Sequence, residues 1–168
     1  MQDKLHRLYQ IQKESTQRGY YQGVIVLENL GRLTTMLKSD QAEIAVRFSI
    51  SSSDYDSAML KGHVEAELGI ECQRCLKPVE IPVDLDFELL IDATDDVVRD
   101  SGLDTVYSED GAIDIFEVIE DELILGLPLV ALHEGGSCNE YWHVSDNVPE
   151  EAERENPFLV LEKLKTTH

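Results

Sequence analysis

The sequence has few cysteines and no long apolar run, and both absences limit what the protein can be. Three cysteines in 168 residues are too few, and odd in number, for a disulfide framework. No apolar stretch reaches the length of about 18 residues needed to span a membrane, and residues 1–7 lack the apolar core of a secretion signal. We therefore expect a cytoplasmic protein without a membrane segment, folded as one domain over residues 1–168.

Basic residues are also scarce, with 14 Lys and Arg against 34 Asp and Glu, for a net charge of −20. The imbalance lies beyond residue 47 and is greatest in residues 84–122, which hold 15 acidic residues and only one basic residue, Arg99. Such a surface repels a phosphate backbone and attracts basic proteins. The alternative is that the charge only keeps the protein soluble and monomeric.

Familiar catalytic motifs are missing as well. The sequence contains no P-loop, no dinucleotide-binding glycine pattern and no nucleophile elbow. Four histidines have no nucleophile or carboxylate nearby in the sequence at a spacing that would indicate a catalytic pair. These are His6, His63, His143 and His168. No catalytic residue is therefore predicted. Among so many acidic residues some pair of carboxylates always looks catalytic, so such a pair does not indicate an active site.

What the sequence does contain is alternation of apolar and polar residues, which predicts three antiparallel strands near 42–51, 58–72 and 79–92. They form a meander with one apolar and one charged face. Three acidic residues on the charged face are predicted to contact a partner. They are Asp84, Asp86 and Glu88. A further strand at Leu129–Leu132 is expected at the sheet edge or closing a small barrel.

The clearest helix is predicted over residues 114–125, with Asp114 as its N-cap and Gly126 as its stop. Its apolar stripe consists of Ile115, Phe116, Ile119 and Leu123. Its solvent-facing residues are expected to be Glu120, Asp121 and Glu122.

The predicted fold class is α+β. It is an antiparallel β-meander, open or closed into a small barrel, with one central helix and a short C-terminal helix that begins at Asn156. Residues 1–21 are expected to form an arm, and residues 92–111 an acidic loop without periodicity.

Cys72 and Cys75 lie between two predicted strands, so the chain should hold a pair of thiols at the tip of a β-hairpin. Zinc needs a second pair of ligands, and His133 with Cys138 can supply it. The alternatives are a cluster that has lost its metal and unrelated thiols. A thioredoxin-like reading requires a helix after the first thiol, which the alternation and Pro78 exclude.

The turn also carries Arg74 and Lys77, the only basic residues between Lys61 and Arg99. We expect these two side chains to contact a partner's phosphate or carboxylate. The alternative is that both are merely solvated turn residues.

Three blocks, at 70–78, 121–130 and 156–165, together resemble the YceD family, the large ribosomal RNA subunit accumulation proteins. The resemblance implies a non-enzymatic factor that supports accumulation or maturation of large-subunit ribosomal RNA. Many YceD-like sequences carry several more cysteines after the Pro-containing block, whereas this chain has one cysteine and one histidine there.

Charge and resemblance together predict a basic ribosomal protein or a ribosome assembly particle as the partner, with RNA contact weak. The alternative function is a zinc-dependent RNA-processing hydrolase. A complete set of three cysteines and one histidine would leave such an enzyme no open coordination position.

Overall fold

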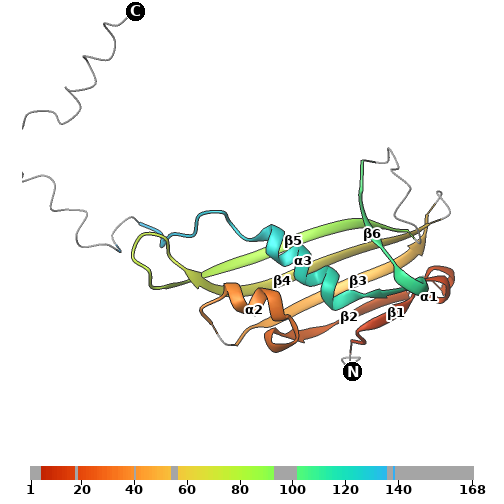
Figure 1. The fold of residues 1–168 in the computed structure, drawn as a ribbon, viewed down its shortest axis with the longest axis horizontal. Coiled ribbons are helices and arrows are strands. Elements are labelled where there is room, and N and C mark those ends of the chain that lie inside the picture. The colour runs from red at the N-terminus through yellow and green to blue at the C-terminus, as the bar shows by residue number, and fades with distance from the viewer. Residues whose placement is uncertain are drawn as a thin grey trace, which may run out of the picture. The chain divides into compact units, whose positions relative to one another are not determined.

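The computed structural model describes residues 5–17, 19–39, 41–53, 57–92, 102–135 and 138, and it confirms an α+β fold (Figure 1). The strands are β1 (Leu8–Gln10), β2 (Gly19–Val26), β3 (Glu43–Ser52), β4 (Ala58–Glu71), β5 (Pro78–Asp92), β6 (Asp104–Tyr107) and β7 (Ala112–Asp114). The helices are α1 (Ile11–Gln17), α2 (Gly31–Met36) and α3 (Ile115–Gly126), with the single turns η1 (Leu27–Asn29) and η2 (Glu109–Gly111). None of these helices is long and apolar enough to cross a membrane.

The main sheet has five strands in the order β2-β3-β4-β5-β6, and the three predicted strands are its centre, β3, β4 and β5. Strands β2 to β5 pair antiparallel, whereas β6 pairs parallel to β5. The sheet is open, because its edge strands β2 and β6 do not pair with each other in the described part of the chain. Strands β1 and β7 form a separate two-stranded ladder.

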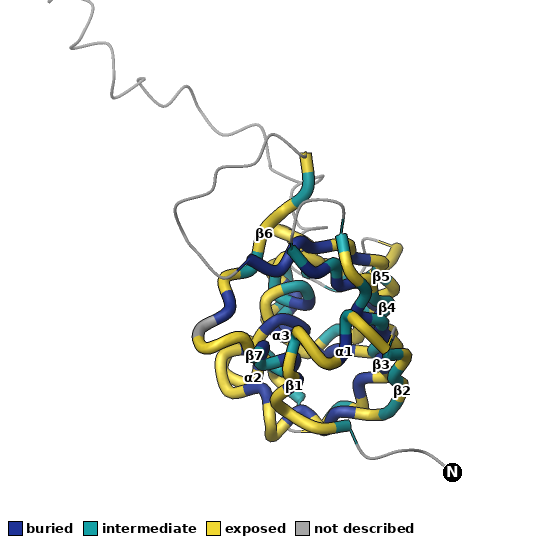
Figure 2. The backbone as a smooth tube through the Cα atoms, turned by 90° about the vertical axis from the view of Figure 1, so that its right-hand side faces the viewer, coloured by how far each residue is buried: buried dark blue, intermediate teal, exposed yellow. Residues whose placement is uncertain are grey.

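Helices α2 and α3 cover one face of the five-stranded sheet, and no described helix covers the other face, which we call the uncovered face (Figures 1 and 2). The covered face carries alternate residues of each strand, as the pleat requires. In β3 these residues are almost fully buried: Ile44, Val46, Phe48 and Ile50. Gly62 of β4 lies opposite Phe87 of β5, and a Cβ at Gly62 would overlap the Phe87 ring. The glycine therefore admits the ring into the core.

Helix α3 begins and ends where the sequence predicts. The Asp114 carboxylate accepts hydrogen bonds from the backbone N–H groups of Phe116, at 3.0 Å, and Glu117, at 3.3 Å, so it caps the first turn. The fully buried members of the stripe are Ile115, Ile119 and Leu123. Phe116 is only half-buried, at the margin of the core.

The segment expected to be an arm lies partly within the fold, where it forms β1, α1 and the start of β2. Tyr9 is 4% exposed, and its ring packs against those of Tyr21 and Phe48 with centroids 4.7 and 5.2 Å away. In the expected acidic loop, residues 104–107 form β6, whereas 93–101 lie outside the described residues. The predicted C-terminal helix also lies outside them.

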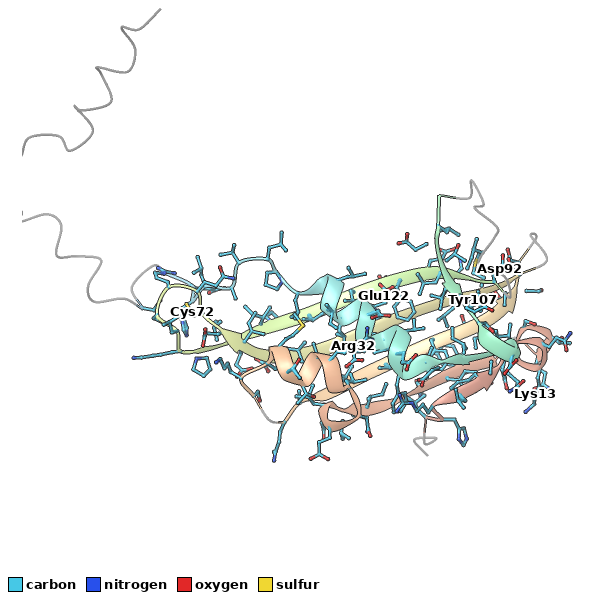
Figure 3. All side chains as sticks on the ribbon, viewed as in Figure 1. Lys13, Arg32, Cys72, Asp92, Tyr107 and Glu122 are labelled. Atoms are coloured by element: carbon cyan, nitrogen blue, oxygen red, sulfur yellow. The ribbon has the colours of Figure 1, made fainter. Side chains whose placement is uncertain are left out.

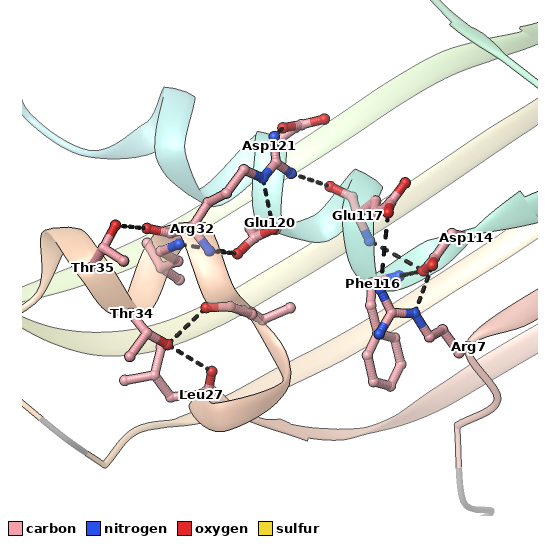
Figure 4. Close-up of polar contacts among 12 residues, drawn as sticks. Arg7, Leu27, Arg32, Thr34, Thr35, Asp114, Phe116, Glu117, Glu120 and Asp121 are labelled. Carbon is pink, nitrogen blue, oxygen red and sulfur yellow. Dashed lines mark hydrogen bonds and ion pairs between the residues drawn. The ribbon is translucent and has the colours of Figure 1, made fainter.

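The expectation that Glu120 faces solvent is wrong, since only 5% of this residue is exposed. Its carboxylate accepts hydrogen bonds from the backbone N–H groups of Arg32, at 2.7 Å, and Leu33, at 3.0 Å, and from Nε of Arg32 at 2.9 Å (Figure 4). The first N–H groups of a helix lack partners within it, so Glu120 of α3 supplies acceptors for the start of α2. Arg32 also contacts Asp121 at 2.6 Å.

We predict that Glu120→Ala lowers the free energy of unfolding by about 2–4 kcal/mol, because it leaves two backbone N–H groups without an acceptor. Glu117→Ala, at an exposed carboxylate on the same helix, should change it by less than about 0.5 kcal/mol. Urea denaturation of both variants measures the difference. An equal, small effect of the two substitutions would contradict the role of Glu120.

Burial alone would raise the pKa of Glu120, but the Leu33 N–H and the Arg32 side chain and N–H outweigh it and lower the pKa below 4.5. The resulting stabilisation is present above pH 4.5 and disappears as the pH falls through the lowered pKa. Wild type should therefore lose more stability in acid than Glu120→Gln does.

Candidate metal centre and acidic sheet face

The turn between β4 and β5 folds the two cysteines of the CxxC motif together. The backbone N–H of Cys72 donates to the Lys77 carbonyl at 2.9 Å, and the N–H of Leu76 donates to the Cys72 carbonyl at 2.8 Å. Leu76, the residue after Cys75, has a φ of 61°, in the left-handed region that favours glycine. In Figure 3, Cys72 lies at one end of the β4–β5 hairpin and Asp92 lies at the other end. The predicted hairpin tip is confirmed.

The prediction of a strand at Leu129–Leu132 is wrong, because this stretch is irregular and crosses the hairpin tip. The backbone N–H of Gln73 donates to the Ala131 carbonyl at 2.9 Å, and its side-chain amide donates to the Leu129 carbonyl at 3.0 Å. Arg74 donates to the His133 carbonyl at 3.0 Å. The carbonyls of Leu129, Ala131 and His133 therefore accept hydrogen bonds from the turn rather than from a strand ladder.

His133 lies beside the CxxC turn with its two ring nitrogens in different roles. Nε2 is 3.0 Å from the Pro78 carbonyl oxygen, which only accepts hydrogen bonds, so Nε2 carries the proton. The other ring nitrogen, Nδ1, faces Sγ of Cys75, 3.5 Å away, and in the neutral ring with its proton on Nε2 it presents a lone pair to that side. Metal-binding histidines are commonly held in this way, with one nitrogen bonded to a backbone carbonyl and the other to the metal.

The four predicted metal ligands lie together, and the ligand atoms of Cys72, Cys75, His133 and Cys138 are all within 4.8 Å of one another. In tetrahedral zinc with Zn–S bonds of about 2.3 Å, ligand atoms are about 3.8 Å apart, so small shifts suffice to close such a site.

The Cys72 thiol is fully buried, and its environment favours the thiolate that metals bind. Burial would raise its pKa. Hydrogen bonds, the largest of them from the backbone N–H groups of Cys75, Arg74 and His133, outweigh burial and lower the pKa to about 5. The residues present therefore fit a structural zinc ion.

The two predicted basic contacts at the hairpin tip differ in their surroundings. Arg74 is half-buried and holds the His133 carbonyl, so part of its role is to keep the crossing segment on the turn. Lys77 is exposed. Contact of either residue with a partner stays a prediction.

The predicted acidic residues of β5 all lie on the uncovered face of the sheet. The side chains of Asp84 and Asp86 are 76% and 87% exposed. Glu88 is partly neutralised by Lys61 of β4, at 2.8 Å. We call this set, Asp84, Asp86 and Glu88, the acidic face; whether it binds a partner stays a prediction.

His63, which sequence reasoning set aside, lies among the carboxylates of this face. Its Nδ1 is 2.8 Å from Asp86, and its Nε2 is 2.8 Å from Glu65 and 3.6 Å from Asp84. The reason is the register of the hairpin, which pairs His63 with Asp86 across β4 and β5. The two residues are distant in sequence, but counting back from the predicted CxxC turn would have found the pair.

The fold and the site thus define a small α+β protein with an open sheet and a cysteine–histidine cluster at a hairpin tip. The chain belongs to the YceD family, described as "Large ribosomal RNA subunit accumulation protein YceD", which matches residues 60–165. It is 32% identical over 161 residues to the protein of that name from Haemophilus influenzae, covering 91% of each chain. No solved structure gives a significant match.

We predict that His63 titrates above its ordinary pKa of 6.5. The hydrogen bond with Asp86 is the largest cause of the raised pKa, with a further contribution from Glu65, against a lowering by burial and Arg47. The associated stabilisation is full below pH 6.5 and is lost as the pH rises through the raised pKa. NMR titration of His63 should show a lower pKa in Asp86→Asn than in wild type. An unchanged pKa would contradict the pairing.

Proposed function

We propose that the protein is a non-enzymatic factor that supports accumulation of large-subunit ribosomal RNA by binding a basic ribosomal protein or an assembly particle. The acidic face is the observation that carries this proposal. Its carboxylates are exposed along β5, on a sheet surface that no described helix covers. The family description and the name of the Haemophilus influenzae relative support the link to ribosomal RNA.

Electrostatics favour a protein partner over naked RNA. Nucleic-acid binding depends on Lys and Arg displacing counterions from phosphates, and this chain has 34 acidic against 14 basic residues. The basic groups on the uncovered face are themselves engaged: Lys61 pairs with Glu88, and Arg47 lies 3.5 Å from Glu65. Attraction of a basic partner acts over a Debye length of about 8 Å at physiological salt and mainly raises the association rate.

The test replaces Asp84→Asn, Asp86→Asn and Glu88→Gln together. Because these three side chains lie on the surface and outside the core, the variant should fold but associate more slowly with its cellular partner, with a weaker dependence on salt. The matched control is Glu117→Gln, Asp121→Asn and Glu122→Gln on α3, which removes three charges from the opposite layer. Partners are recovered by crosslinking from cells, and both bound protein and bound RNA are identified.

Equal behaviour of the two triple variants would mean that the acidic face is only a solubility device. Tight binding of large-subunit RNA at physiological salt, without any protein, would also reject the proposal. RNA cleavage by the purified protein would favour the alternative, a zinc-dependent RNA-processing hydrolase.

We further propose that Cys72, Cys75, His133 and Cys138 bind one structural zinc ion, which would fasten the segment after α3 to the hairpin tip. Four protein ligands leave no position for water or substrate, which supports a structural rather than a catalytic role. A bound zinc ion would link the four ligand atoms. The Pro78 carbonyl would orient the His133 ring, and the turn would orient both thiols of the CxxC motif.

Protein purified without added metal should therefore contain about one zinc per chain. Cys75→Ser should lose the metal and melt at a lower temperature, since losing one of four ligands usually collapses a structural site. His63→Gln, at a histidine outside the cluster, should keep it. Elemental analysis and thermal melting provide the readouts. Absence of metal, with unchanged melting of Cys75→Ser, would leave the four residues as packing or relic side chains.

A further inference from the structure

Strand β2 is an edge of the five-stranded sheet and has an unusually open backbone. In the described part of the chain its eight residues pair with β3 alone, from Gly19↔Ile50 to Val26↔Glu43. Beyond this ladder, no backbone hydrogen bond of Gly19–Val26 is found within the described ranges. In an antiparallel pair, alternate residues direct their N–H and C=O groups away from the partner strand. About half of β2 therefore offers an unpaired row of donors and acceptors.

The usual protections of an edge strand are absent from β2. Natural edges are shielded by charged residues, proline, bulges or short length. Strand β2 reads Gly-Tyr-Tyr-Gln-Gly-Val-Ile-Val, without a charge or a proline, and its register with β3 is unbroken. The other edge, β6, has four residues and begins with Asp104. An edge as long and uncharged as β2 is a ready template for another strand.

The side chains of β2 add apolar contact area on the uncovered face. Tyr20 is 64% exposed, Val24 44% and Val26 45%. Two hollows adjoin them. One, of about 270 Å³, lies over Gly23 and Ala45, and the other, of about 350 Å³, is lined by residues 26–28 and 41–43. A strand paired to the outer edge of β2 would lie about 5 Å from it, so its long side chains on this face would reach the part of each hollow that β2 lines.

Charge indicates which kind of chain fits. The second hollow is lined by Glu28 and Glu43, and the first by Glu65, which already contacts Arg47 and His63. The acidic face continues the negative surface across the sheet. A second copy of this chain would bring another net charge of −20 against it, so a basic partner is favoured over self-association.

We propose that β2 binds an extended, basic segment of a protein partner by strand addition, with Lys or Arg side chains at Glu28 and Glu43. This deepens the proposed function and rests on it, since it names the mode in which a basic protein is held. Main-chain hydrogen bonds would supply affinity, and the alternate side chains would supply specificity.

The first test uses an eight-residue peptide of alternating Lys and Val, with blocked ends, as the probe. On binding, alternate backbone amides of Gly19–Val26 should become protected from hydrogen exchange, as measured by NMR. The control peptide has the same sequence with N-methyl groups on two adjacent central residues, which blocks both of its edges but keeps its charge. It should bind about tenfold more weakly, since it cannot complete the ladder. Equal binding of both peptides, or no protection in β2, would overturn the proposal.

The second test adds a lysine to the edge itself. Val24→Lys should weaken binding of the unmethylated peptide about tenfold, since an edge lysine both protects the edge and repels a basic strand. Leu125→Lys adds the same charge at a leucine that is 78% exposed on α3 and serves as the matched control. If the two substitutions weaken peptide binding equally, the change in net charge alone explains the loss, and strand addition is rejected. The peptide comparison on wild type does not depend on either variant folding.

Failure of this proposal is distinguishable from failure of the proposed function. If Val24→Lys keeps the cellular partner while the acidic-face variant loses it, the basic partner stands and only the strand-addition mode is rejected. If neither variant nor wild type recovers a basic protein, the proposed function itself is wrong.

Discussion

The antiparallel pairing of β4 with β5 is the interaction on which both candidate surfaces depend. The two strands remain in register from Ala58↔Ile91 to Glu71↔Pro78, so the hairpin is long and its turn is limited to six residues that carry the CxxC motif. The same register aligns His63 with Asp86 on the uncovered face. A slip by one residue would exchange the two faces of the strand, moving the acidic face into the core and the apolar residues into solvent.

Helix α3 connects the core to the hairpin tip. Its buried stripe packs on the covered face of the sheet, and Glu120 accepts the N–H groups that start α2, so both helices are fixed to each other as well as to the strands. Beyond Gly126, the chain continues across the turn, where Ala131 and His133 accept hydrogen bonds from Gln73 and Arg74. The position of His133 therefore follows from the seating of α3, and the cysteine–histidine cluster joins the segment after α3 to the β4–β5 hairpin.

The uncovered face combines exposed carboxylates with basic groups that are already paired. Lys61 and Arg47 neutralise only part of its charge, and His63 is held between Asp86 and Glu65. The described contacts therefore leave a negative potential on this face. Next to it lies an uncharged edge strand with exposed apolar side chains. In the binding mode that we propose, long-range attraction by this face and backbone pairing at β2 would act together on an extended basic segment.

The sequence by itself determined the features that depend on neighbours along the chain. Alternation predicted the three central strands, Asp114 and Gly126 predicted the limits of α3, and the short spacing of Cys72 and Cys75 predicted the hairpin tip, because strand period, helix capping and turn chemistry are local. Only the tertiary structure decided the environment of Glu120, which looks exposed on its own helix until α2 is packed against it. It also decided the irregular path through Ala131, the carboxylates around His63 and the open edge at β2. These features depend on which groups meet across space, and the pattern of a single segment does not record its neighbours in the fold.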